Sequence, residues 1–339
     1  MRITWLFGNG LDLSYGLKTS YFHFYKYLLE LEKQNLITEE NIIFLQLKHD
    51  FEKHKEDLWS DYETRLGELT TLISEEQIEK FENDKIQIDL FLNDYLKNEE
   101  KNLKIDENQT QKILTNSFNQ IIKCSRLVDN NQINELIRVN SQSHFKFTAI
   151  SFNYTKTVSI LWGNNPNLLN SFKLNGYPTS HSSILEIPFY LHGTLEDGQM
   201  IIGVNDFSQI KNEELKNSTE LSEALFKSSL LNQAGQLHLE QFTSLINETE
   251  IICTYGLSIG KTDSYYWKII KERLLKSKSI LIIYYYDKTY VNAHISLTNR
   301  ITNQVKSKFY SNSEATDDEI ERIKDRIIIE VNHELFLPE

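Results

Sequence analysis

Hydrophobic residues are spaced in two different ways along this chain. Short runs in which nearly every residue is apolar appear at the start and again after residue 145. They are Ile3–Phe7, Phe147–Phe152, Ile187–Leu191, Met200–Gly203, Glu250–Tyr255, Ser279–Tyr286 and Arg326–Val331. Such runs are typical of strands buried on both faces of a parallel sheet, and helical spacing fills most of the chain between them. The pattern predicts an α/β fold with a Rossmann-like open, mainly parallel sheet flanked by helices.

Residues 35–145 differ from the rest of the chain in composition. They are rich in Glu, Lys, Asn and Gln, and their apolar residues recur at helical spacing with few strand signals. We expect them to form a large helical insertion after the first strand and helix, where they would cover a site at the sheet. The remaining segments, 1–34 and 146–339, are predicted to form one α/β domain.

Charge and composition narrow the class of protein. The chain has 339 residues and a formal net charge of −12, which disfavours nonspecific binding to nucleic acid or to an anionic membrane. Its two cysteines, Cys124 and Cys253, are too few for a disulfide framework, and we expect buried free thiols in a reducing compartment. No apolar run approaches the ~18 residues of a membrane span, and no secretory signal is recognisable. We expect a soluble cytoplasmic protein.

The first strand ends in a glycine turn, Gly8-Asn9-Gly10, that leads into a helix. Glycines at such a turn let backbone N–H groups approach a phosphate, and the helix N-terminus adds partial positive charge. The G-x-G-x-x-G form is incomplete because position 13 is Leu. Taken alone, the turn is as consistent with a tight strand-to-helix connection as with a nucleotide site.

Three later strands also end in small or polar residues. Their turns are Asn153-Tyr154-Thr155, His192-Gly193 and Gly256-Leu257-Ser258. Ligands of open parallel sheets bind outside the carboxyl ends of the strands, so we expect the four turns to converge on one cleft. There, Asn153 would supply an amide, Ser258 a hydroxyl, and His192 the group that titrates near neutral pH.

Each candidate residue also has an ordinary structural interpretation. A histidine at the end of a strand is commonly a structural hydrogen-bonding group. Asp12 and Asp263 lie where short carboxylates often cap a helix N-terminus. Asp61 and Glu63, next to Trp59, are two residues apart and do not share a helical face, so a solvated helix start is the default for them.

Several motifs together resemble the AbiH family of bacterial proteins, which are associated with abortive infection. The matching segments follow one another through most of the chain, and they are Gly8–Asp12, Gly16–Tyr21, Leu58–Glu63, Phe152–Thr157, Leu191–Gly193 and Gly256–Asp263. In abortive infection, an infected cell stops growing before phage can spread. The resemblance implies a phage-defence effector.

A more distant resemblance, to the sirtuin superfamily and its sirtuin-like NAD hydrolases, implies a chemistry. It rests on the order of Gly-x-Gly, an Asn at a strand end, Leu-His-Gly and Gly-x-Ser along the chain. It implies that Gly8 and Gly10 hold the NAD pyrophosphate. It further implies Asn153 at the nicotinamide ribose, His192 as general base or partner of a ribose hydroxyl, and Ser258 near the adenosine.

We therefore predict that the chain binds and hydrolyses NAD, or a related nucleotide, at the carboxyl ends of the strands. Asp12 and Thr155 depart from the sirtuin pattern, which favours hydrolysis or simple binding over deacylation. The predicted catalytic residues are His192, Asn153 and Asp12. The predicted binding residues are Gly8, Asn9, Gly10, Thr155, Gly193, Gly256, Ser258 and Asp263, and no metal is predicted.

Two further hypotheses stay open on the sequence. The chain is a nucleotide-binding sensor that acts through a partner without turnover, or it is a nuclease. The negative charge and the lack of a carboxylate–metal motif weigh against the nuclease. The expected partners are NAD or another nucleotide, with a phage-derived trigger protein and a second copy of the chain as further candidates.

Overall fold

The computed structural model contains a seven-stranded sheet whose named strands pair in parallel. It describes residues 1–54, 62–140, 144–163, 183–196, 200–235, 237–290 and 295–338. The strands are β1 (Arg2–Phe7), β2 (Phe145–Ser151), β3 (Ser183–Leu185), β4 (Phe189–Tyr190), β5 (Ile251–Tyr255), β6 (Ile280–Tyr285) and β7 (Ile327–Val331). Their order is β3-β2-β1-β5-β6-β7, and β4 also pairs with β2. The predicted open, parallel α/β sheet is confirmed.

β1 lies in the middle of the sheet, where its apolar sequence is buried along its whole length. It pairs with β2 on one side and β5 on the other, so that Trp5 is opposite Ala149 and Cys253. The chain extends the sheet first towards β2 and β3, and later towards β5, β6 and β7. The strand order therefore reverses between β1 and β5, and a doubly wound sheet binds its ligands in the crevice at such a point.

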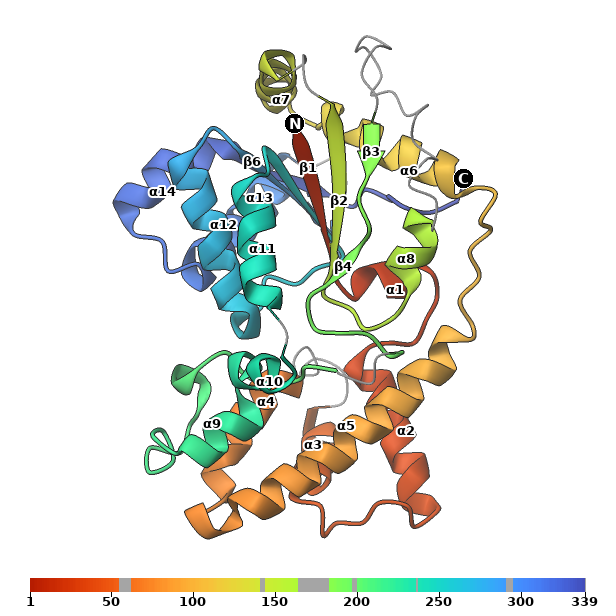
Figure 1. Ribbon diagram of the computed structural model, residues 1–339, viewed down its shortest axis with the longest axis vertical. Coiled ribbons are helices and arrows are strands. Elements are labelled where there is room, and N and C mark those ends of the chain that lie inside the picture. The colour runs from red at the N-terminus through yellow and green to blue at the C-terminus, as the bar shows by residue number, and fades with distance from the viewer. Residues whose placement is uncertain are drawn as a thin grey trace.

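Helices cover both faces of the sheet (Figure 1). On one face, α6 (Thr110–Asn119), α7 (Leu127–Val139) and α8 (Thr157–Trp162) share a hydrophobic cluster with Trp5 and Phe7. On the other face, α11 (His238–Asn247), α12 (Ser264–Lys276), α13 (Ile295–Asn312) and α14 (Asp317–Ile323) pack around Leu6 and Ile283. Short 3₁₀ helices connect other elements: η1 (Thr70–Leu72), η2 (Glu75–Gln77), η3 (Gln120–Ile122), η5 (Phe207–Gln209), η6 (Lys261–Asp263) and η7 (Lys324–Arg326).

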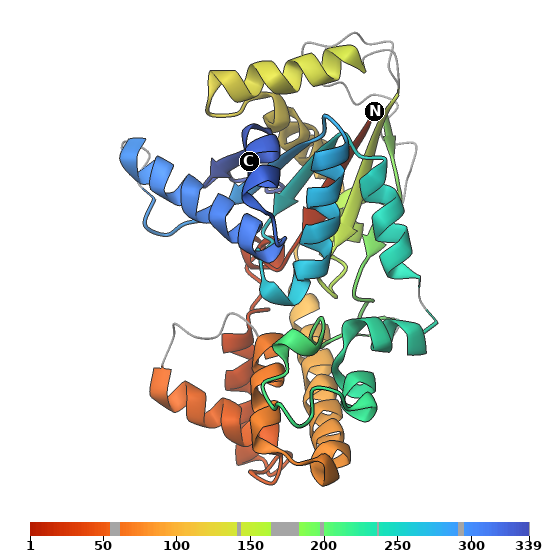
Figure 2. The same cartoon turned by 90° about the vertical axis from the view of Figure 1, so that its left-hand side faces the viewer.

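A second group of helices lies beyond the carboxyl ends of the strands (Figures 1 and 2). We call it the helical lobe: α2 (Tyr21–Lys33), α3 (Ile42–His54), α4 (Tyr62–Leu69), α5 (Ile78–Glu100), α9 (Thr219–Leu225) and α10 (Lys227–Gln233). A separate hydrophobic cluster, which includes Tyr25, Phe44 and Phe81, forms its core. The lobe contains the first part of the helical insertion predicted at 35–145, namely α3, α4 and α5, and the later helices α9 and α10 extend it.

The domain boundaries predicted from composition, 1–34 and 146–339 against 35–145, stay a prediction. The hydrophobic clusters group the helices in another way, since α2 packs within the helical lobe and α6 and α7 pack on the sheet. Apolar contacts between distant segments, which composition does not report, decide this grouping.

Two details of the predicted strands differ from the structure. The strand expected at Met200–Gly203 is wrong: the segment is irregular, and next to it Val204 forms an isolated bridge with Phe226. Ile201 and Ile202 of this segment are buried without belonging to the sheet. The strand expected at Ile187–Leu191 is shortened to β4. Both cysteines are buried and free, as expected, and within the described ranges no helix has the length and apolarity to cross a membrane.

Candidate functional site

One pocket collects the carboxyl ends of the strands. It has a volume of about 960 Å³ and lies between the sheet and the helical lobe, whose Glu63, Leu92 and Leu96 contribute to its wall. Every predicted site residue lines the pocket except Gly193. Gly193 directly follows His192 and is buried, but it is not part of the lining. The turns identified from the sequence therefore meet at one cavity, and the roles assigned to their residues stay predictions.

The glycines after β1 and β5 allow the two turns to pack backbone against backbone. A Cβ on Gly10 would lie 2.5 Å from the Cα of Gly256. Gly256 itself has a φ of +63°, and a Cβ there would lie 2.5 Å from the nitrogen of Leu11. The amides of Gly8 and Gly10 donate to Tyr255 O at 3.1 Å and to Gly256 O at 2.8 Å. These two amides therefore join β1 to β5 and are not available to a phosphate.

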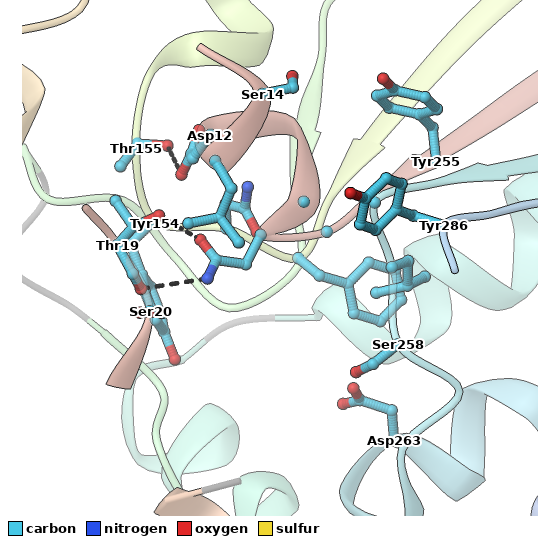
Figure 3. Close-up of a pocket in the computed structure, with 18 of the residues that line it drawn as sticks. Asp12, Ser14, Thr19, Ser20, Tyr154, Thr155, Tyr255, Ser258, Asp263 and Tyr286 are labelled. Atoms are coloured by element: carbon cyan, nitrogen blue, oxygen red, sulfur yellow. Dashed lines mark hydrogen bonds between the residues drawn. The ribbon is translucent and has the colours of Figure 1, made fainter. Parts of the chain in front are cut away.

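Asn9 holds the following loop against the same turn. Its side-chain nitrogen donates to Thr19 O at 3.1 Å, and Thr19 Oγ1 donates to its side-chain oxygen (Figure 3). Both halves of the Asn9 amide are thus used within the protein.

Asp12 is a buried carboxylate held by hydroxyl groups. It lies in the short helix α1 (Gly10–Ser14), whose N-cap residue is Asn9, so the interpretation of Asp12 as a cap is wrong. Thr155 Oγ1 donates to Asp12 Oδ2 at 2.7 Å (Figure 3), whereas Oδ1 is buried without a hydrogen-bond partner. Burial raises the pKa of Asp12 to about 6, against the opposing effect of hydrogen bonds from Thr157 and Thr155. The charge of Asp12 therefore changes close to neutral pH.

His192 and Asn153 are buried with polar atoms left over. His192 is 3% exposed, and neither ring nitrogen has a hydrogen-bond partner. Its Nε2 lies 3.6 Å from Asp263 Oδ1, which is longer than a hydrogen bond. Burial, helped by the positive charge of Lys227, lowers the pKa of His192 to about 4, so the imidazole is neutral at physiological pH. The side-chain nitrogen of Asn153 is likewise buried without a partner.

A buried ion cluster beside His192 is the part of the site that sequence reasoning missed. We call Glu63, Lys227 and Asp263 the carboxylate–lysine cluster. Lys227 Nζ lies 2.8 Å from Glu63 Oε2 and 3.0 Å from Asp263 Oδ1. Burial alone would lower the pKa of Lys227, but the two carboxylates raise it overall, so this lysine keeps its charge. Burial likewise opposes the charge of Asp263, yet Lys227 and His192 hold its pKa well below the usual range.

The cluster overturns the structural interpretation of Glu63. Glu63 is 8% exposed and ion-paired, so its assignment to a solvated helix start is wrong. Trp59 and Asp61 lie outside the described residues. Asp263 precedes α12 at the N-cap position but makes no side-chain cap hydrogen bond. Lys227 carried no signal of its own, because the sequence around it predicts only a helical stretch.

Tyrosines line another part of the pocket. They are Tyr255 at the end of β5 and Tyr284, Tyr285 and Tyr286 at the end of β6. Figure 3 shows Tyr255 and Tyr286 on the same side, with Ser258 and Asp263 below them. Ser258 is exposed. Aromatic side chains at a pocket wall provide flat surfaces on which a planar base can stack, and the run of three tyrosines at a strand end was the available signal.

The charges in the pocket are mostly negative. Among the described lining residues, Lys227 is the single lysine or arginine, whereas Asp12, Glu63, Asp263 and Glu334 are acidic. Within the described part of the chain, no group of three His, Cys, Asp or Glu side chains could hold a metal ion. The region around Asp12, Glu63 and Asp263 therefore favours a cationic group over an anionic one.

Comparison with known families identifies the chain. The family model for bacteriophage abortive infection AbiH matches residues 4–286, which is more than half of the sequence. The chain belongs to the AbiH family. Membership indicates a role in phage abortive infection, and it confirms the first of the two resemblances seen in the sequence. The similarity to sirtuins stays a prediction. No curated protein matches the chain.

Proposed function

We propose that this AbiH protein binds NAD, or a related nucleotide, in the pocket and hydrolyses its bond to nicotinamide as the effector step of abortive infection. The observation that carries the proposal is a set of buried polar atoms without partners. They are the ring nitrogens of His192, the amide nitrogen of Asn153 and Oδ1 of Asp12, and all three residues line one pocket. Buried polar groups are normally hydrogen-bonded, so leftover groups in a pocket mark where a ligand supplies the partners.

The reaction consumes one water molecule for each nucleotide. The bond between the ribose C1′ and the ring nitrogen breaks, and nicotinamide leaves as a neutral molecule with the bonding electrons. The water oxygen forms a new bond to C1′ and gives up a proton, so the products are ADP-ribose, nicotinamide and a proton. Asp12, whose pKa is about 6, is better matched to accept this proton near neutral pH than His192, whose pKa is about 4.

The electrostatics of the pocket support this assignment. The nicotinamide ring of NAD is cationic, and the sugar acquires positive charge as the bond breaks. Asp12 and the carboxylate–lysine cluster place negative charge beside such a group in a partly enclosed site, where electrostatic stabilisation is strongest. The neutral His192 and the amide of Asn153 are then hydrogen-bonding groups for a ribose hydroxyl or the attacking water.

The rest of the nucleotide has to be bound without the amides of Gly8 and Gly10, which are already engaged. The wall formed by Tyr255 and Tyr284–Tyr286 supports stacking of a planar base, and the exposed Ser258 offers a hydroxyl on the same side. We assign the adenosine half to this region.

Hydrolysis of cellular NAD would also harm an uninfected host, so the proposal requires gating. The helical lobe forms part of the pocket wall through Glu63, Leu92 and Leu96. A phage-derived trigger protein, or a second copy of the chain, that displaces this lobe would therefore alter the site directly.

The test measures nicotinamide release from NAD by chromatography, using the purified full chain alone and with lysate of phage-infected cells. We expect His192→Ala and Asn153→Ala each to reduce the rate by ~100-fold or more. His49→Ala replaces an exposed histidine of α3 that does not line the pocket, and it should leave the rate unchanged. Asp12→Asn should remove the acidic limb of the pH–rate profile, which we expect near pH 6.

Two outcomes separate the hypotheses. Release no greater than that of the His192 and Asn153 variants, under every condition, disproves hydrolysis. Tight binding of NAD or ADP-ribose by calorimetry without any product would favour the sensor that acts through a partner.

A further inference from the structure

We propose that Lys227 is a positioning residue of this pocket: its ammonium balances the charge of the Asp263 carboxylate beside the His192 imidazole and ties Asp263 to Glu63 of the helical lobe. The inference deepens the proposed function and rests on it for its consequence in turnover. The geometry of the cluster, by contrast, can be tested without any substrate.

The ammonium of Lys227 is fully used by this arrangement. It lies 2.8 Å from Glu63 Oε2 and 3.0 Å from Asp263 Oδ1, and it donates to Thr262 O at 3.3 Å. An ammonium group has three protons to donate, so these contacts fix its position completely. Because Lys227 is 3% exposed, water does not replace any of the three contacts freely.

The backbone around the cluster is as constrained as the side chains. The amide of Lys227 donates to Val204 O at 2.9 Å, and the amide of Gly203 donates to Glu63 Oε1 at 3.4 Å. A Cβ on Gly203 would lie 2.1 Å from Leu225 O, so the segments before α10 and around residue 203 pack in direct contact. Glu63, Gly203 and Lys227 are therefore packed together as one unit of the helical lobe.

The elements packed against His192 shift the pKa of its imidazole in opposite directions. Burial lowers its pKa most, Lys227 of α10 and His238 of α11 lower it further, and Asp263 of η6 raises it. Tyr266 of α12 contacts the imidazole through its ring, with 5.8 Å between the ring centroids. A carboxylate 3.6 Å from an imidazole would by itself favour the charged imidazolium. Burial and the positive charge of Lys227 together outweigh this effect, so Asp263 can lie beside His192 while the imidazole stays neutral.

The cluster also connects the two halves of the molecule. Glu63 and Lys227 belong to α4 and α10 of the helical lobe, whereas Asp263 and His192 follow β5 and β4 of the sheet. A shift of the helical lobe would therefore separate Lys227 from Asp263 or carry Asp263 away from His192. Either change alters the charge balance at the imidazole.

The experiment is an NMR titration of the full chain labelled at histidine, with the His192 signal assigned from a His192→Gln sample. In the wild-type protein, we expect a midpoint near pH 4. In Lys227→Met, the midpoint should rise by about one pH unit or more, because Asp263 then acts on the imidazole without its counter-charge. Lys227→Arg should stay near the wild-type value. Lys271→Met, which removes a buried lysine paired with Glu319 at 3.1 Å outside the pocket lining, should leave it unchanged.

A second variant covers the case in which Lys227→Met does not fold. Lys227→Met/Glu63→Gln removes one charge of each sign, and we expect it to regain thermal stability while the His192 midpoint stays raised. An unchanged midpoint in either folded variant overturns the proposal. A raised midpoint in a protein that never releases nicotinamide would support the positioning role and disprove hydrolysis, so the two failures are distinguishable.

Discussion

Asp12, which is buried, and Asp263, whose side chain is 13% exposed, are two carboxylates on opposite sides of one pocket (Figure 3), and their surroundings shift their pKa values in opposite directions. Asp12 lies beside the hydroxyls of Thr155 and Thr157, which only partly offset burial, so its pKa rises to about 6. Asp263 contacts the ammonium of Lys227, which holds its pKa well below the usual range despite burial. The pocket thus combines one carboxylate that titrates near neutral pH with one that keeps its charge.

The difference shows how the partners of a carboxylate decide whether it keeps its charge at neutral pH. A hydroxyl group stabilises a buried carboxylate only partly, because it donates a single hydrogen bond and carries no net charge. A buried ammonium compensates the charge directly, provided that its own donors are satisfied. The Asp12 side is therefore suited to proton transfer, whereas the Asp263 side is suited to holding other groups in place.

Among these substitutions, removal of Lys227 should lower the stability of the protein most, because Asp263 loses its counter-charge. Lys227→Met leaves Glu63 and Asp263 buried beside each other without their counter-charge, and we expect the free energy of unfolding to fall by about 3–5 kcal/mol. Urea denaturation at pH 7 measures the loss. Lys271→Met is the control for removing a buried lysine elsewhere. A loss below that of the control would contradict the compensation that we assign to Lys227.

The two aspartates should respond to amide substitution with opposite signs. The folded pKa of Asp12 is raised from 3.8, so the unfolded chain loses its proton first, and stability falls as pH rises from about 4 to 6. Asp12→Asn should remove this fall and add about 2–3 kcal/mol above pH 6. The folded pKa of Asp263 is depressed, so its contribution is present at neutral pH, and Asp263→Asn should destabilise there.

Denaturation curves from pH 3 to 8 test both variants together. The same sign for the two substitutions at pH 7 would show that the contrast between the two sides is wrong.

The contact between the turns of β1 and β5 should tolerate little change. Gly256→Ala adds a methyl group 2.5 Å from Leu11 N at a φ of +63°, and we expect a loss of about 2 kcal/mol. Gly235→Ala is the matched control, because its φ is +65° but nothing lies within 4 Å of the added carbon. Thermal or urea unfolding of the pair separates backbone strain from the clash. Equal losses would show that the two turns are free to separate.

The smallest effect is expected at the hydroxyl that holds Asp12. Thr155→Val removes the donor 2.7 Å from Asp12 Oδ2, which should cost about 1 kcal/mol above pH 6 and less below it, where Asp12 is protonated. The comparison needs only two urea series, at pH 7.5 and pH 4.5. A loss that is independent of pH would assign the effect to packing instead of to the carboxylate.

Much of the fold was predictable from local pattern. Ile3–Phe7 was recognisable as a buried strand, and the polar turns at residues 153 and 192 were placed correctly at strand ends. The strand predicted at Met200–Gly203 was wrong because a buried irregular segment has the same apolar composition as a short strand. The grouping of α6 and α7 with the sheet depended on packing that composition does not encode.

The sequence by itself determined the parallel sheet and the meeting of the turns at one edge, because burial on both faces demands continuous apolar runs, whereas the central place of β1 came from the structure. The glycines at positions 8 and 10 were also visible, but only the tertiary structure showed that their amides bind β5. Only the tertiary structure decided which carboxylate titrates near neutral pH, since a pKa depends on burial and on partners far away in sequence. Glu63, Lys227 and Asp263 form one cluster only after three distant segments have packed together.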